Sequence, residues 1–186
     1  MSAAAAKENS RLRKQDGRAR LVRRKECVVV GIGNPLMGDD GVGIEVANAL
    51  RKVNLGSRIL VLERQIMDIS VLDSASGASK LVIVDAVKSG RPPGSVMKFM
   101  AGLPRSPVLR APLSHEQDLH DLIALARRSG MRLPPTVVVG VEPANCSAGK
   151  GLSKEVKGAL PRALEEVRNE VKECAEKGTD SPAKSF

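Results

Sequence analysis

Two adjacent carboxylates follow a glycine-rich turn near the start of the chain. Residues 27–43 read CVVVGIGNPLMGDDGVG, so a short β-branched run leads into Asp39 and Asp40, and a helical pattern begins just beyond them. Loops at the carboxyl ends of parallel strands are where α/β proteins bind ligands. An acid before a helix can also be an N-cap, but only one of the pair is needed for that. Because Gly41 and Gly43 would let a ligand approach the backbone closely, we favour Asp40 for the chemistry, which leaves Asp39 to cap the helix.

Two more candidates follow later segments. Asp85 comes directly after the apolar run at 81–84, although a cap or a turn acid that faces solvent would fit it equally well. His115 stands at the start of a helical pattern, where a surface or capping histidine is the simpler interpretation. His120, the other histidine, would diverge from His115 on a helix, so the two cannot share a metal.

Asp40, Asp85 and His115 together suggest a more specific site. Two carboxylates and one imidazole from separate loops could form an open site for a divalent ion, and imidazole suits nickel and zinc. A metal held there could polarise a carbonyl or generate hydroxide. Glu142 and Pro143 could line the same edge, but a turn that ends the strand is the interpretation we favour.

Other catalytic and binding motifs fit poorly. Gly31 and Gly33 begin a dinucleotide fingerprint, and Glu63 could supply its acid, but Leu36 stands where the third glycine is needed. The loop lacks the Gly-Lys-Ser/Thr of a P-loop, and the chain has no His-Glu-x-x-His and no Gly-x-Ser-x-Gly elbow. A nucleotide-binding domain, a zincin and a serine hydrolase are therefore disfavoured.

The candidate residues require a framework of strands and helices to position them. Five segments have the character of strands: 27–30, 58–63, 80–85, 95–100 and 135–141. The fourth follows a Pro-Pro-Gly turn, and we expect it to be an antiparallel edge strand. The first, third and fifth are continuous apolar runs, as in strands covered on both faces. Apolar periodicity predicts helices at 42–53, 69–76, 115–128 and 154–176, with a start at Ser153 and a kink or break near Pro161. Alternating strands and helices predict an α/β fold of three layers, with a mostly parallel sheet of about five strands between helices.

Composition and charge bound the remaining possibilities. The chain of 186 residues has a formal charge of +9 and only two aromatic residues, which disfavours a nucleic-acid surface built on base stacking. Residues 1–26 carry nine Lys or Arg against three acids, a net charge of +6. We expect a disordered basic leader at 1–26, one domain at 27–177 and a polar tail at 178–186. Three distant cysteines and the absence of an apolar signal or membrane span indicate a protein of the cytoplasm, with no membrane partner.

The chain resembles the peptidases that mature nickel–iron hydrogenases, from about Cys27 to about Val171. The first matching stretch is long and specific, and the others are short but follow in the family's order: 31–43, 82–86, 113–115, 121–126 and 140–143. The resemblance implies a twisted five-stranded sheet of phosphorylase/hydrolase-like architecture. It also implies an aspartyl-type endopeptidase that removes the C-terminal extension of a hydrogenase large-subunit precursor after nickel insertion.

By position, the family's metal-contacting residues fall on Asp40, Asp85 and His115. The nickel would be carried by the substrate, so the resting enzyme need not hold a metal, and we expect a monomer that binds no nucleic acid. Residues 64–68 depart from the family pattern after the second strand. Two alternatives remain open: a non-catalytic nickel-binding assembly module, and a nucleotide-binding α/β domain.

Overall fold

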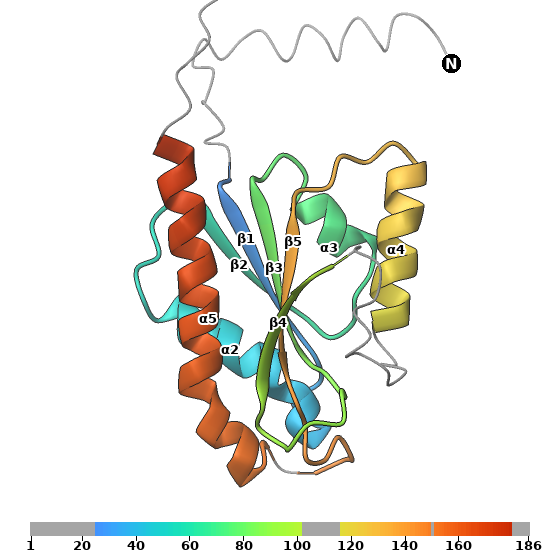
Figure 1. Cartoon of the computed structure of the whole chain (residues 1–186), viewed down its shortest axis with the longest axis vertical. Helices are drawn as coiled ribbons and strands as arrows, with labels where there is room; N and C mark the ends of the chain where they lie inside the picture. Colours follow the sequence, from blue (N-terminus) through green and yellow to red (C-terminus); the bar gives the residue numbers. More distant parts are fainter. Residues whose placement is uncertain (1–24, 102–115, 150, 180–186) are drawn as a thin grey trace, which may run out of the picture.

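A computed structural model of the chain describes residues 25–101, 116–149 and 151–179 (Figure 1). Its elements follow in the order β1 (Cys27–Ile32), η1 (Gly38–Gly41), α2 (Val42–Arg51), β2 (Ile59–Arg64), α3 (Ile69–Ser74), β3 (Lys80–Ala86), β4 (Val96–Met100), α4 (Glu116–Arg128), β5 (Thr136–Val141) and α5 (Lys154–Thr179). The predicted elements are therefore all present, with ends that shift by a few residues.

One twisted sheet organises these elements, with strands in the order β2-β1-β3-β5-β4. β1 pairs in parallel with β2 and β3, and β3 pairs in parallel with β5. β4 pairs antiparallel with β5, which confirms the predicted edge strand. The four parallel strands end at one edge of the sheet, which we call the carboxyl edge, and begin at the opposite amino edge. Every residue of β1 and β5 is buried, as their continuous apolar runs predicted.

Helices cover both faces of the sheet, so the predicted three-layer α/β fold is confirmed (Figure 1). Cys27 and Val29 of β1 belong to one core together with α2 and α5. Val28 and Val30 belong to the opposite core, with α3 and α4. The alternation is the period of two that a strand imposes on its side chains.

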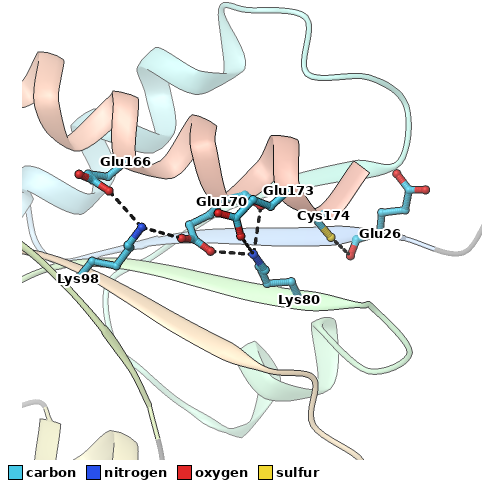
Figure 2. A network of polar contacts seen from close by, with 7 residues as sticks. All are labelled: Glu26, Lys80, Lys98, Glu166, Glu170, Glu173 and Cys174. Atoms are coloured by element: carbon cyan, nitrogen blue, oxygen red, sulfur yellow. Dashed lines mark hydrogen bonds and ion pairs between the residues drawn. The ribbon is translucent and has the colours of Figure 1, made fainter. Parts of the chain in front are cut away.

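An ionic network centred on the buried pair Lys80 and Glu170 attaches α5 to the sheet near the amino edge (Figure 2). Glu170 accepts hydrogen bonds from Lys80 of β3, at 2.7 Å, and pairs with Lys98 of β4 at 3.0 Å. Glu173 and Glu166 supply the second partners of the two lysines, at 3.2 and 3.3 Å. The Glu170 side chain is only 6% exposed, so its charge depends on both cations.

Two local predictions at α5 have different outcomes. Ser153 starts the helix as predicted, because its hydroxyl accepts a hydrogen bond from the amide of Val156 at 3.3 Å. Of the kink or break predicted near Pro161, the break is wrong, since α5 continues through Pro161 to Thr179, and the kink stays a prediction. Burial of one helix face against the sheet outweighs the hydrogen bond that a proline removes.

The described residues can be compared with the predicted ends of the leader and the tail. Glu26, assigned to the leader, is buried, and its carbonyl accepts hydrogen bonds from the amides of Ser79 and Lys80. The leader before Lys25 and the tail after Thr179 lie outside the described residues. Within the described ranges, no helix has the length and apolar character required to cross a membrane.

Candidate active site

The loop between β1 and η1 folds back on the candidate ligand Asp40. The amide of Asn34 donates a hydrogen bond of 2.7 Å to Oδ2 of Asp40. Gly33 makes this possible: its φ of +131° suits glycine, and a Cβ there would collide with the carbonyl oxygen of Asp40. Asp40 as a whole remains partly exposed, with one carboxylate oxygen held by this hydrogen bond.

Asp39 has a different role from the one predicted. It is fully buried and accepts three backbone hydrogen bonds, from Ala144 at 2.8 Å, Asn145 at 3.0 Å and Ser153 at 2.6 Å. Burial alone would raise the pKa of Asp39, but these three amides outweigh burial and lower it. The capping prediction is wrong, because the N-cap of α2 is Gly41 and has no side-chain hydrogen bond. Asp39 instead ties the loop after β1 to the loop after β5.

Asp85 is the next-to-last residue of β3 and is 8% exposed, so it is not a turn acid that faces solvent. Its Oδ1 accepts a hydrogen bond from the amide of Ala86 at 2.8 Å. Gly43 brings α2 close to this position, because a Cβ there would collide with the carbonyl oxygens of Ile32 and Val84. The start of α2 therefore packs directly on the ends of β1 and β3, which places Asp40 and Asp85 at the same edge.

Cys146 belongs to the same region, although sequence reasoning did not single it out. It is partly buried in the loop after β5. Burial raises the pKa of its thiol, and the carboxylates of Asp40, Asp39 and Asp85 raise the pKa further, while Lys88 opposes them. All three acids therefore lie within electrostatic range of one thiol. The only signal in the sequence was the position of Cys146 just after a buried strand.

Glu142 confirms the interpretation that the sequence favoured. It is 6% exposed and accepts hydrogen bonds from the amide and hydroxyl of Ser89, at 2.8 and 2.6 Å, and from the amide of Gly90 at 3.2 Å. Its carboxylate is occupied in fixing the loop after β3. Glu142 is thus a structural residue of the carboxyl edge.

The third predicted ligand, His115, lies outside the described residues. Within the part of the chain that the structure describes, no three His, Cys, Asp or Glu side chains are arranged to hold a metal ion. Asp40 and Asp85 offer two oxygen donors, and the complete ligand set stays a prediction that depends on His115.

A cavity of about 460 Å³ lies elsewhere, near the amino edge. It is lined by the ionic network of α5 together with Phe99, Met100, Pro135 and Val137. It is remote from the loops that carry Asp40 and Asp85, and its charged groups are paired with one another. We therefore take the carboxyl edge as the candidate site.

Solved structures of hydrogenase maturation proteases have the same fold as this chain. The hydrogenase maturating endopeptidase HybD from Escherichia coli superposes with a TM-score of 0.67 at 25% identity, over 80% of this chain and 93% of that one. The hydrogenase maturation protease HycI from Thermococcus kodakarensis, at 20% identity and a TM-score of 0.62, has the same fold over 81% of this chain and 95% of its own.

Sequence comparisons agree with this likeness. FrxA of Pyrococcus furiosus is 34% identical over 141 residues, which are 74% of this chain and 98% of that protein. The hydrogenase 2 maturation protease of Escherichia coli is 25% identical over 75% of this chain and 87% of its own. HupD of Thiocapsa roseopersicina is 29% identical, and the match spans 65% of its length.

The family model for hydrogenase maturation proteases matches residues 44–170. This range includes Asp85, and Asp40 lies four residues before it. The resemblance first drawn from the motif at 31–43 is therefore confirmed over most of the folded chain: the protein belongs to the hydrogenase maturation protease family and is a peptidase.

Proposed function

We propose that this protein is the endopeptidase that removes the C-terminal extension of a nickel–iron hydrogenase large-subunit precursor. Family membership supports the reaction class and the kind of substrate. The single observation that supports the site most directly is the close packing of Gly43 on the carbonyl oxygens of Ile32 and Val84, which brings the start of α2, and Asp40 before it, to the edge where Asp85 lies near the end of β3. Two carboxylates so placed offer hard oxygen donors to a divalent ion.

In this proposal the nickel belongs to the substrate. Nickel already inserted in the precursor would be contacted by Asp40, Asp85 and His115, which would hold the scissile peptide bond over the carboxyl edge. A water molecule then attacks the carbonyl carbon, a C–O bond forms and the C–N bond breaks. One proton of the water would pass to the leaving amine and the other to a base, for which Asp40, partly exposed, is the candidate; the substrate's nickel could instead activate the same water by lowering its pKa. Cleavage would thus wait until the metal is in place.

The proposal is tested by removing one charge at the edge. Asp40→Asn keeps the size of the side chain but loses the anionic donor, so processing of a nickel-loaded precursor should fall by at least about 100-fold, the range typical of a catalytic acid–base group. Product mass, followed over time, is the measurement. Asp73→Asn, which removes an exposed carboxylate of α3, is the matched control and should process at the wild-type rate.

The outcome separates the peptidase from the assembly module. Cleavage at the wild-type rate by Asp40→Asn would overturn the role given to Asp40. Tight binding of a verified nickel-loaded precursor by the wild-type protein without any cleavage would support the non-catalytic alternative instead.

A further inference from the structure

Two large apolar side chains are conspicuously exposed at the carboxyl edge. Leu36 is 76% exposed and Ile66 is 64% exposed, the highest values among the large apolar residues that the structure describes. Leu36 lies in the loop after β1, and Ile66 lies in the loop after β2. Single exposed apolar residues are common on protein surfaces, so their position rather than their number has to support any role.

The two loops leave the sheet side by side. β1 and β2 are parallel neighbours with Ile32 opposite Arg64, and the amide of Gly33 donates a hydrogen bond of 3.1 Å to the carbonyl of Arg64. Leu36 follows Gly33 by three residues, and Ile66 follows Arg64 by two. Both side chains therefore emerge from adjacent strand ends at the edge that carries Asp40.

The backbone at Leu36 is held on both sides. Its amide donates to Oδ1 of Asn34 at 3.0 Å, and its carbonyl accepts from the amide of Gly149 at 3.1 Å. Asn34 in turn donates through its amide to Asp40 at 2.7 Å. The loop that presents Leu36 to solvent is thus the loop that holds the candidate catalytic carboxylate.

The backbone after Ile66 is also anchored. Asp68 caps α3 by accepting from the amides of Ser70 and Val71, at 2.9 and 3.3 Å. Met67 packs against the core beneath α3 and α4. An apolar side chain displayed by a fixed backbone loses little conformational freedom when a partner covers it.

We propose that Leu36 and Ile66 form a docking contact for the polypeptide of the hydrogenase precursor, a contact that rests on the proposed function. Side chains this exposed do not line an enclosed cavity, so they suit a macromolecular surface rather than a small ligand. The loop that presents Leu36 also holds Asp40, so a precursor whose scissile bond lies at Asp40 would lie beside both loops, and apolar residues next to that bond would cover both side chains. Burial of apolar surface supplies affinity without taking part in the chemistry.

The test separates binding from turnover. In Leu36→Ser with Ile66→Ser, the KM for nickel-loaded precursor should rise about 10-fold or more, with kcat within about twofold of the wild type. Leu125→Ser is the matched control: Leu125 is 59% exposed, but it lies near the end of α4 that leads toward the amino edge (Figure 1). Its KM and kcat should both match the wild type. The single variants and a thermal melt check that each exposed substitution leaves the fold intact.

Direct binding of the precursor, measured without cleavage, distinguishes the two proposals. If the wild type binds but does not cleave, the peptidase proposal fails, and weaker binding by the double variant alone would still support the docking contact. If the wild type cleaves and the double variant keeps its KM, or loses kcat at unchanged KM, the docking contact is overturned. An equal loss of binding by Leu125→Ser would also overturn it, because the effect would not belong to this edge.

Discussion

At the scale of single residues, the two neighbouring aspartates have different environments at the candidate site. Asp39 is buried and accepts three backbone hydrogen bonds, whereas Asp40 accepts a backbone hydrogen bond from Asn34 and stays partly exposed. A carboxylate that receives several amide hydrogen bonds is strongly held in its charged form. Asp39 therefore fixes the loop, and its neighbour Asp40 stays partly exposed, as its proposed role in binding substrate requires.

Replacing Asp39 by Asn should lower the free energy of unfolding by about 2–3 kcal/mol, because amides that now meet a charged acceptor would lose part of their hydrogen bonding. Urea unfolding at pH 7 measures the change. Asp73→Asn, an exposed carboxylate of α3, should stay within about 0.5 kcal/mol of the wild type. Equal stability of the Asp39 and Asp73 variants would contradict the structural role of Asp39.

At the scale of elements, the approach of α2 to the sheet sets the geometry of the carboxyl edge. Gly43 lies against the carbonyl oxygens of Ile32 and Val84, and Gly31 lies against the first turn of the helix. No side chain fits between these backbones. The contact is therefore what carries Asp40, just before α2, toward the end of β3.

Gly43→Ala should destabilise the protein by about 1–3 kcal/mol or more, because its Cβ must displace backbone at two strand ends. It should also slow processing by moving Asp40 relative to Asp85. Gly158→Ala in α5 is the matched control: nothing lies within 4 Å of its Cβ, and alanine in a helix should stabilise by up to about 1 kcal/mol. Thermal melts of both variants measure these effects. A melting temperature that shifts in the same direction in both variants would contradict the close packing inferred at Gly43.

At the scale of the whole molecule, buried charges at both edges couple folding to pH. At the carboxyl edge, burial would raise the pKa of Asp39, and backbone amides lower it. At the amino edge, burial is likewise outweighed: hydrogen bonds with Lys80 and Lys98 lower the pKa of Glu170, and hydrogen bonds with Glu170 and Glu173 raise the pKa of Lys80.

The directions of these pKa shifts predict that the stability is constant over a middle pH range and falls at both acidic and alkaline pH. A lowered carboxyl pKa contributes stability above the unfolded value, about 4, and this is lost as the pH falls through the folded value. A raised lysine pKa contributes stability below about 10.4, and this is lost as the pH rises through the folded value. The urea midpoint should thus be nearly constant around pH 6–9 and fall below about pH 4. A midpoint unchanged from pH 7 to pH 3 would contradict this linkage.

The sequence by itself determined the layers and the main candidates. Continuous apolar runs identified β1, β3 and β5 as strands buried on both faces. An acid directly after such a run indicated Asp85 at the end of β3, and the glycine-rich turn after β1 indicated Asp40. These features can be predicted because strand period, glycine turns and helix periodicity depend only on residues that are close together in the sequence. Helix ends and the passage of α5 through Pro161 were less well predicted, since packing overrides local preference there.

The tertiary structure alone decided how the site is assembled. The partners of Asp39 are 105 to 114 residues away in the chain, and Cys146 approaches the same acids from the loop after β5. No local pattern encodes which amides a buried carboxylate will meet, so the sequence assigned Asp39 to a nearby helix cap. Its true partners exist only once the parallel sheet has brought the ends of β1, β3 and β5 to one edge.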